Sequence, residues 1–327
     1  MAPKGWLDVH THFYTWSSEP ERQIAIQGMR DACFMVADSW SWSVDDSLAY
    51  QDQAGVQMQL LSYLPQTIEK LRAANDFAAD VVKRHPSRFG MLCALPTDDP
   101  KACLAEIERG RSELDADGFA VSAVYKDVML SSPALDPVWS RLNALSEGAV
   151  VFSHPNAYAP PKDGRPTPLI EVAFETARVI VDLLYRRTFT KYPNVKFVFS
   201  HCGGVLPMLA GRLELLGGES WVPNPEKLTS KDIKEELSRI WVDCAATAET
   251  GLQPAIKMVG SAQVVYGADC GVPCSRSETM ERNRKSVKKV LEELGLEEDL
   301  VGRNGWNLFP RAAARAKKNE VNGIDAH

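Results

Sequence analysis

Short apolar runs rich in β-branched and aromatic residues alternate along this chain with longer segments of helical period. The runs predict eight strands, at Trp6–His10, Val56–Tyr63, Phe89–Leu95, Gly118–Val124, Ala149–Ser153, Val195–Ser200, Ile240–Cys244 and Gln263–Gly267. The helical pattern predicts helices that include Ile68–Arg84, Pro137–Ser146, Ile170–Thr190, Ser277–Leu294 and Gly305–Lys317. Strands that alternate with helices indicate an α/β fold with a parallel sheet and outer helices.

Eight such repeats predict that the sheet closes into a (β/α)8 TIM barrel. We expect one domain over residues 1–317 and a flexible C-terminal tail over residues 318–327. The alternative is an open doubly wound sheet, which normally has a glycine-rich turn after its first strand. Here the first strand ends in His10-Thr11-His12-Phe13 instead, a poor cradle for phosphate and a good start for a metal site.

Two long loops break the regular alternation, at residues 13–50 after the first strand and residues 155–168 after the fifth. Both follow the carboxyl ends of strands, where barrel enzymes place their active sites. The first loop is rich in aromatic residues, among them Phe13, Tyr14 and Trp42. These side chains are either a small core beneath the loop or a wall that contacts substrate, and the pattern leaves both possibilities open.

Composition narrows the class of protein. The chain has 37 Lys and Arg residues against 43 Asp and Glu residues, a formal charge of −6, so it has no general attraction for the phosphates of nucleic acids. No run of 18 apolar residues predicts a membrane span. The seven cysteines are an odd number and lie mostly in apolar runs, which is typical of free thiols in a reducing compartment. We therefore expect a cytoplasmic protein.

Four of the six histidines stand at the ends of predicted strands: His10, His12, His154 and His201. Asp269 follows the eighth strand, so a closed barrel would bring all five side chains to one rim. Alternate residues of a strand point to the same side, which lets both His10 and His12 face one ion. Three imidazoles and a carboxylate suit zinc. We therefore predict one divalent metal ion, preferably Zn2+ with Mn2+ as the alternative, bound by His10, His12, His154 and Asp269.

His201 could be a further ligand or a general acid and base. We favour the second role, because three histidines and one aspartate already complete a tetrahedron. Asp243 ends the seventh strand, where its carboxylate could hold a ligand histidine or cap the following helix.

The chain resembles the amidohydrolase-related metal-dependent decarboxylases, the group of aminocarboxymuconate semialdehyde, resorcylate and methylsalicylate decarboxylases. The matching segments include Asp8-Val9-His10-Thr11-His12, Ser153-His154-Pro155, Ser200-His201-Cys202-Gly203-Gly204 and Tyr266-Gly267-Ala268-Asp269, and they follow the order of the family. The resemblance implies a zinc or manganese site made of the same residues, with His201 beside the metal-bound water. It also implies a homodimer in which an arginine reaches the neighbouring active site, and Arg212 matches that arginine in position.

The chain departs from the aminocarboxymuconate enzyme where that enzyme binds its substrate. Met35 and Asp38 stand where that enzyme has arginines, and Asn156 replaces a tryptophan. A less charged aromatic acid, such as a salicylate, therefore fits better than the dianionic semialdehyde.

Together these features predict a metal-dependent, non-oxidative decarboxylase of a hydroxyaryl carboxylic acid. Asp269 or His201 would deliver the proton that replaces CO2 on the ring. The predicted substrate contacts are Phe13, Tyr14, Trp42, Asn156 and Arg212. The alternative is a hydrolase or hydratase that acts on a lactone, ester or amide, because the same ligands would activate water.

Overall fold

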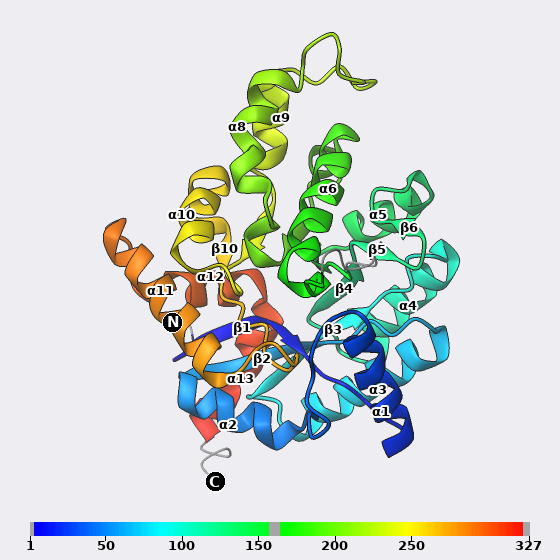
Figure 1. Ribbon diagram of the computed structural model, residues 1–327, viewed down its shortest axis with the longest axis vertical. Helices are drawn as coiled ribbons and strands as arrows, with labels where there is room; N and C mark the ends of the chain where they lie inside the picture. The colour runs from blue at the N-terminus through cyan, green and yellow to red at the C-terminus, as the bar shows by residue number, and fades with distance from the viewer. Residues whose placement is uncertain (1–2, 157–163, 323–327) are drawn as a thin grey trace.

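Eight parallel strands follow one another around a barrel in the order in which they occur in the chain, with helices outside them (Figure 1). The computed structural model describes residues 3–156 and 164–322. The strands of the barrel are β1 (Trp6–His12), β2 (Val56–Ser62), β3 (Phe89–Ala94), β4 (Gly118–Ser122), β7 (Ala149–His154), β8 (Val195–Phe199), β9 (Trp241–Asp243) and β10 (Val264–Val265). The predicted TIM barrel is thus confirmed.

Backbone hydrogen bonds between β1 and the chain that follows β10 close the barrel. The amide of Val9 donates to the carbonyl of Tyr266 at 3.0 Å, and the amide of His12 donates to the carbonyl of Cys270 at 2.7 Å. In the opposite direction, the amide of Asp269 donates to the carbonyl of His10 at 3.0 Å. The last strand is therefore tied to the first at the level of the histidines.

The helices are α1 (Glu19–Asp31), α2 (Val44–Ala54), α3 (Ile68–Arg84), α4 (Pro100–Ser112), α5 (Asp136–Asn143), α6 (Glu171–Tyr185), α7 (Thr188–Lys191), α8 (Leu206–Leu216), α9 (Ser230–Leu237), α10 (Ala248–Val259), α11 (Ser277–Glu293), α12 (Leu300–Leu308) and α13 (Pro310–Asn322). Single 3-10 turns are η1 (Pro133–Leu135), η2 (Thr167–Leu169), η3 (His201–Gly203) and η4 (Ser261–Gln263). The predicted helix Ile68–Arg84 is confirmed with the same bounds, and the Thr67 side chain caps its first turn.

Two predicted helices are each divided in two. The segment Ile170–Thr190 forms α6 and α7, because Arg187 adopts a left-handed backbone with φ of 53° between them. The segment Gly305–Lys317 is divided before Pro310, whose ring cannot continue a helix that already began at Leu300. The chain from 310 remains helical to Asn322, which includes the start of the predicted tail, and residues 323–327 lie outside the described residues.

The first of the two long loops contains helices, whereas the second is described only in part. The loop after β1 is not irregular throughout, because it contains α1 and α2. Ser18 and Ser43 cap these two helices, so the start of each is encoded locally. In the loop after β7, residues 157–163 lie outside the described residues. A small antiparallel hairpin, β5 (Val124–Tyr125) and β6 (Val128–Met129), follows β4.

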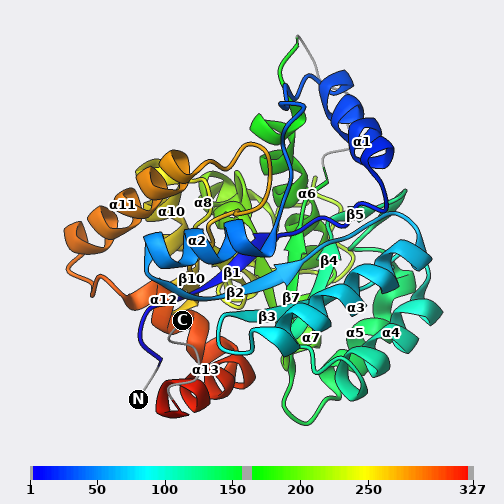
Figure 2. The same ribbon diagram turned by 90° about the horizontal axis from the view of Figure 1, so that it is seen from below.

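The interior of the barrel is apolar below the histidines. Leu7, Leu60, Leu92 and Val198 come from four different strands and are almost fully buried in one cluster. Trp306 joins this cluster from α12, and α12 and α13 lie together at one end of the molecule (Figure 2). The barrel is therefore a filled core with a polar layer at one end. None of the described helices is long and apolar enough to cross a membrane.

Replacement of Leu60 by Ala should lower the free energy of unfolding by about 2–5 kcal/mol, because it leaves a cavity in a fully buried cluster. The measurement is urea unfolding followed by circular dichroism. Leu294→Ala is the control, since this leucine is 44% exposed and its loss should change stability by less than about 0.5 kcal/mol. Equal effects of the two substitutions would contradict the assigned core.

Candidate metal centre and active site

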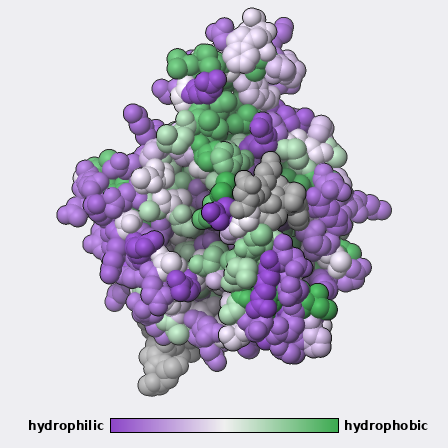
Figure 3. Space-filling model, viewed as in Figure 1, coloured by the Kyte–Doolittle hydropathy of each residue, from purple (hydrophilic) through white to green (hydrophobic). Residues whose placement is uncertain are grey.

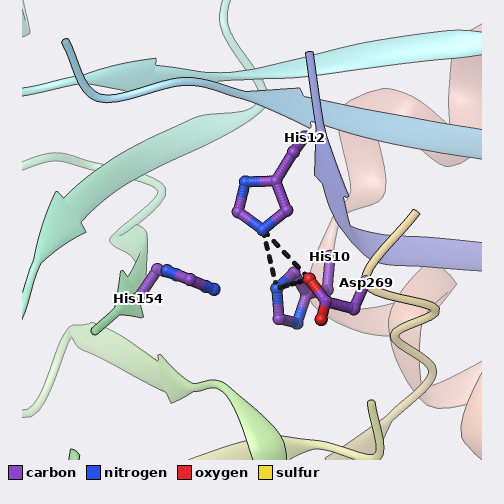
Figure 4. A group of neighbouring side chains, drawn as sticks. All are labelled: His10, His12, His154 and Asp269. Carbon is purple, nitrogen blue, oxygen red and sulfur yellow. Dashed lines mark hydrogen bonds and ion pairs between the residues drawn. The ribbon is translucent and has the colours of Figure 1, made fainter. Parts of the chain in front are cut away.

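Four side chains from three separate parts of the chain meet at the carboxyl ends of the strands. His10 and His12 come from β1, His154 ends β7, and Asp269 follows β10. One ligand atom of each lies within 4.8 Å of those of the other three. Figure 4 shows the three imidazoles and the carboxylate turned toward a common point. These are the four residues that the sequence analysis assigned as ligands.

A β-bulge in β1 places both histidines inside the barrel. Asp8 pairs with Gln59 and Thr11 pairs with Leu61, so three steps along β1 correspond to two along β2. Such a bulge bends the strand and redirects the side chains that follow it. Without it, the alternation that buries Leu7 and Val9 in the interior would turn His10 outward. The simple alternation used in the sequence analysis holds between His10 and His12 but not from Leu7 onward.

The donor atoms are arranged in a way that favours a cation. His10 Nδ1 lies 2.8 Å from Asp243 Oδ2, both side chains being fully buried. Nδ1 donates its proton to this carboxylate, so Nε2 is the ring nitrogen that faces the cluster. That atom lies 3.1 Å from His12 Nε2, and Asp269 Oδ1 lies 3.2 Å from both nitrogens. Lone pairs this close repel one another unless positive charge lies between them.

One carboxylate oxygen of the cluster has no hydrogen-bond donor. Asp269 Oδ1 is buried and makes no hydrogen bond within the described residues. A buried carboxylate oxygen without a donor is costly unless a metal ion or a proton satisfies it. The donor set of three imidazoles and one carboxylate also matches the preferences of zinc and of other divalent transition metals. The residues present therefore fit a resident metal ion.

The shifts in pKa within the cluster also favour a positive charge there. Burial opposes protonation of His10, but the carboxylates of Asp243 and Asp269 outweigh it and raise the pKa of His10 to about 10. Burial, together with the neighbouring His12 and His10, holds the pKa of His154 well below its usual value. Burial also opposes ionisation of Asp269, but His10 and the contacts with His12 and His201 keep its pKa well below the usual range. The carboxylate is thus ionised and one positive charge is favoured among the imidazoles.

His201 lies at the edge of this cluster. Its Nε2 is 3.7 Å from Asp269 Oδ2, and the centre of its ring is 5.0 Å from that of His10. Its Nδ1 is buried and has no hydrogen-bond partner among the described residues. Both His201 and Asp269 have a left-handed backbone, with φ of 55° and 58°. Strain of this kind is frequent at functional sites, where the surrounding structure holds it in place.

Asp243 performs one of the two functions that the sequence analysis left open, since it holds His10 but does not cap the following helix, α10, whose first turn has no side-chain cap. Its Oδ2 accepts from His10 Nδ1, while its Oδ1 accepts from the amides of His201 at 2.9 Å and Ala245 at 2.8 Å. One carboxylate thus orients a candidate ligand histidine and holds the turn that carries His201. Ligand histidines in metal sites commonly have such a partner, which fixes the tautomer of the ring.

Asp8 is a functional candidate that the sequence analysis assigned no role. It is fully buried and accepts four hydrogen bonds. Burial raises the pKa of its carboxyl to about 6, against hydrogen bonds from Gln59, Ala268 and His10 that lower it. A charged residue between the apolar Leu7 and Val9 was the available signal, because buried carboxylates are rare unless they are paired.

The sequence analysis left open whether the aromatic residues of the first loop form a small core or a wall that contacts substrate, and the structure divides them between the two. Phe13 is 1% exposed and stacks on Phe77 at 5.7 Å, so its contacts are those of a core residue beneath the loop. Tyr14 packs against Tyr63, and the charge of Asp269 contributes to raising the pKa of its hydroxyl, after burial and Tyr63. Tyr14 therefore lies within electrostatic range of the cluster.

Trp42 lies against the loop that carries Asp269. A Cβ built on Gly271 would be 3.2 Å from Trp42 Cδ1 and only 2.1 Å from the carbonyl oxygen of His12. With its φ of 97°, this position requires glycine. The indole Nε1 of Trp42 is buried and has no partner among the described residues. It is a hydrogen-bond donor beside the cluster.

Asn156 and Arg212 are the two remaining predicted substrate contacts, and neither is among the side chains of the cluster. The amide nitrogen of the Asn156 side chain donates to Ser122 Oγ and to the carbonyl of Val124, and its backbone amide donates to Glu175 at 2.8 Å. These bonds join the end of β7 to β4 and α6, so they give Asn156 a structural role. Arg212 is exposed and lines a cavity of about 590 Å3 between α6 and α8.

A model of the amidohydrolase family matches residues 7–280 of this chain. The chain belongs to that family. The match includes β1, β7, β8 and the segment after β10, and therefore all five residues of the site. The resemblance noted from the sequence motifs is thereby confirmed at the level of the family.

Curated relatives of this amidohydrolase are named as decarboxylases. Decarboxylase yanB of Aspergillus niger is 30% identical over 301 residues, which cover 83% of this chain and 79% of the relative. The 6-methylsalicylic acid decarboxylase of Penicillium expansum is 26% identical over 80% of this chain and 84% of its own. Among solved structures, the dihydroxybenzoic acid decarboxylase of Polaromonas with bound manganese superimposes with a TM-score of 0.75 at 23% identity, covering 96% of this chain and 99% of the other. The similarity to this structure supports the barrel fold.

Replacement of His154 by Ala should remove the metal from the purified protein, because the three remaining donors no longer surround an ion. Elemental analysis after dialysis should give about one zinc or manganese per wild-type chain and almost none in the variant. His85→Ala is the control, since His85 ends α3 and packs beside Phe89, away from the cluster. Unchanged metal content in His154→Ala would exclude this residue as a ligand.

Proposed function

We propose that this amidohydrolase is a metal-dependent, non-oxidative decarboxylase of a hydroxyaryl, salicylate-like carboxylic acid. The observation that carries the proposal is the buried cluster of three imidazoles and one carboxylate at the carboxyl ends of the barrel strands. The names of the relatives, among them a 6-methylsalicylic acid decarboxylase, support this reaction and this class of substrate. Loss of CO2 makes the protein a carboxy-lyase.

We assign His10, His12, His154 and Asp269 as the ligands of one divalent ion, with zinc preferred because of the three imidazoles. Manganese is the alternative, since the dihydroxybenzoic acid decarboxylase of Polaromonas contains it. When bound, the metal would orient the carboxylate and the adjacent hydroxyl of the substrate and stabilise their negative charge.

The protein must then deliver a proton to the ring carbon that loses CO2. Asp269 and His201 are the two candidates, and the 3.7 Å between Asp269 Oδ2 and His201 Nε2 lets them act as a pair. Asp243 holds the backbone of His201 in its strained conformation, so the imidazole is oriented before substrate binds. A preoriented acid avoids the cost of ordering during the reaction.

Tyr14 and Trp42 are the proposed contacts of the aromatic ring. The buried indole Nε1 of Trp42 has no partner among the described residues and could donate to the substrate. Phe13, which is almost fully buried, supports this wall from behind. Asn156 keeps the neighbouring strand ends in place, and through them the position of the substrate.

The charges of the first loop favour a substrate with a single carboxylate. Met35 is 80% exposed, and the carboxylate of Asp38 is paired with Arg30 at 2.7 Å. Arg30 also donates to the carbonyl of Val36, which holds it within its own loop. The loop thus offers little positive charge for a second acidic group. All seven cysteines are free thiols, which supports a cytoplasmic location.

A panel of aromatic acids tests the reaction. The metal-loaded protein should release CO2 from salicylate, 6-methylsalicylate or 2,6-dihydroxybenzoate, and not from benzoate, which lacks the adjacent hydroxyl that the metal would bind. His201→Ala should reduce turnover about a hundredfold or more while metal content stays constant. Cleavage of the corresponding esters or lactones without CO2 release would instead identify a hydrolase, and unchanged turnover in His201→Ala would remove this residue from the mechanism.

We further propose that the protein is a homodimer formed through α6 and α8. Apolar side chains gather along these helices (Figure 3). Phe174, Met208 and Leu215 are between 59% and 77% exposed there, beside the cavity that Arg212 lines. A contiguous exposed apolar surface of this kind is typical of a protein interface. A second copy bound at this surface would place Arg212 next to α6. Helix α6 is bonded to the segment after β7, since Glu175 accepts from the amide of Asn156.

Leu215→Glu should convert the dimer into a monomer, because a carboxylate would be buried in the apolar interface. Light scattering after size-exclusion chromatography should give twice the mass of one chain for the wild type and the mass of a single chain for the variant. Leu294→Glu is the matched control, an exposed leucine at the end of α11, and should remain dimeric. A monomeric wild type would contradict the proposed interface.

A further inference from the structure

The carboxylate of Asp8 is fully buried and holds two segments of the metal site at once. Its Oδ1 accepts from the amides of His10 at 3.1 Å and Ala268 at 3.0 Å. Its Oδ2 accepts from Thr11 Oγ1 and from Gln59 Nε2, each at 3.0 Å. The carboxylate is therefore the acceptor in all four of these hydrogen bonds.

The two backbone amides belong to the residues that position the ligands. His10 is itself a ligand of the proposed site, and Ala268 directly precedes Asp269. Asp269 has a left-handed backbone with φ of 58°, and its own amide donates to the carbonyl of His10 at 3.0 Å. Residues in such conformations persist where neighbouring contacts determine them. Asp8 supplies one of the contacts that hold Asp269 against β1.

A chain of amide side chains joins Asp8 to Arg88. The guanidinium Nε of Arg88 donates to Gln51 Oε1 at 3.0 Å, and Gln51 Nε2 donates to Gln59 Oε1 at 3.1 Å. Gln59 Nε2 then donates to Asp8 Oδ2. Arg88 has only donors to offer, so both glutamine amides are fixed in one orientation, with their NH2 groups toward Asp8. The direction of this series of hydrogen bonds thus requires an acceptor at position 8.

We propose that Asp8 is a positioning residue of the metal site, which sets the geometry of His10 and Asp269 through their backbone. The directed series of hydrogen bonds from Arg88 requires an oxygen acceptor at this position. This inference rests on the metal site proposed above. Asp8 acts through the ligands and does not itself contact the ion, because its side chain bonds to Gln59 on the side of β1 opposite the interior cluster.

The substitution Asp8→Asn tests the proposal with almost no change in shape. The introduced Oδ1 can still accept from the two amides, but the introduced NH2 group faces the NH2 group of Gln59, and the chain cannot reverse because of Arg88. We expect the affinity of the metal-free protein for Mn2+ to fall about ten- to a hundredfold, as for other residues that orient metal ligands. The measurement is titration of the full chain with Mn2+, followed by electron paramagnetic resonance of the free ion.

The double variant Asp8→Asn with Gln59→Glu distinguishes positioning from a general loss of stability. In it the amide introduced at position 8 donates to the new carboxylate at position 59, which also accepts from Gln51, so the donors and acceptors match again and the charge is unchanged. We expect Mn2+ affinity within about threefold of the wild type, a coupling between neighbouring residues that a double-mutant cycle measures. Asp117→Asn is the matched control, an aspartate with a buried side chain paired with Arg315, and should alter stability without altering Mn2+ affinity.

Wild-type Mn2+ affinity in Asp8→Asn would overturn the proposal, as would a folded double variant that binds Mn2+ no better than Asp8→Asn. If Asp8→Asn does not fold, Gln59→Met tests the same chain, and its affinity should fall about three- to tenfold. Unchanged Mn2+ affinity in a folded Gln59→Met would also overturn it. Failure of the wild type to bind Mn2+ or Zn2+ would refute the proposed metal site itself, whereas failure to release CO2 would leave the result on Asp8 intact.

Discussion

The repulsion among closely spaced lone pairs is the constraint on which the rest of this structure depends. His10 Nε2, His12 Nε2 and Asp269 Oδ1 lie 3.1–3.2 Å from one another in a buried site. In a low dielectric, such an arrangement is costly without a positive charge at its centre. A proton or a metal ion among these atoms removes that cost, and the three imidazoles and one carboxylate suit a metal ion, which is the physical reason for regarding the cluster as a candidate metal centre.

Two carboxylates beside the cluster hold its residues in a rigid geometry. Asp243 holds the ring of His10 and the backbone of His201, and Asp8 holds the backbone of His10 and Ala268. Together they maintain two left-handed residues that would otherwise relax. The ligands are therefore placed by their backbone as much as by their own contacts, and a barrel with a well-packed interior gives this backbone a fixed support.

The apolar surface along α6 and α8 and the polar cluster are parts of one arrangement. Glu175 of α6 bonds to Asn156, the residue two positions after the proposed ligand His154. A contact at this surface would therefore act on a segment continuous with the metal site. The proposed interface would therefore lie beside the carboxyl ends of the strands, where barrel active sites lie.

The amino-acid sequence by itself determined the barrel and most of its strands and pointed to the four proposed ligands, because the period of apolar residues and the polar residues at strand ends are local properties. It did not determine the bulge in β1, the breaks at Arg187 and Pro310, or the division of the aromatic loop between core and site. It also indicated no role for Asp8, whose partner Ala268 is 260 residues away. Such features arise only when distant segments pack together. The partners available to a buried polar group depend on the neighbours that the folded chain brings together in three dimensions.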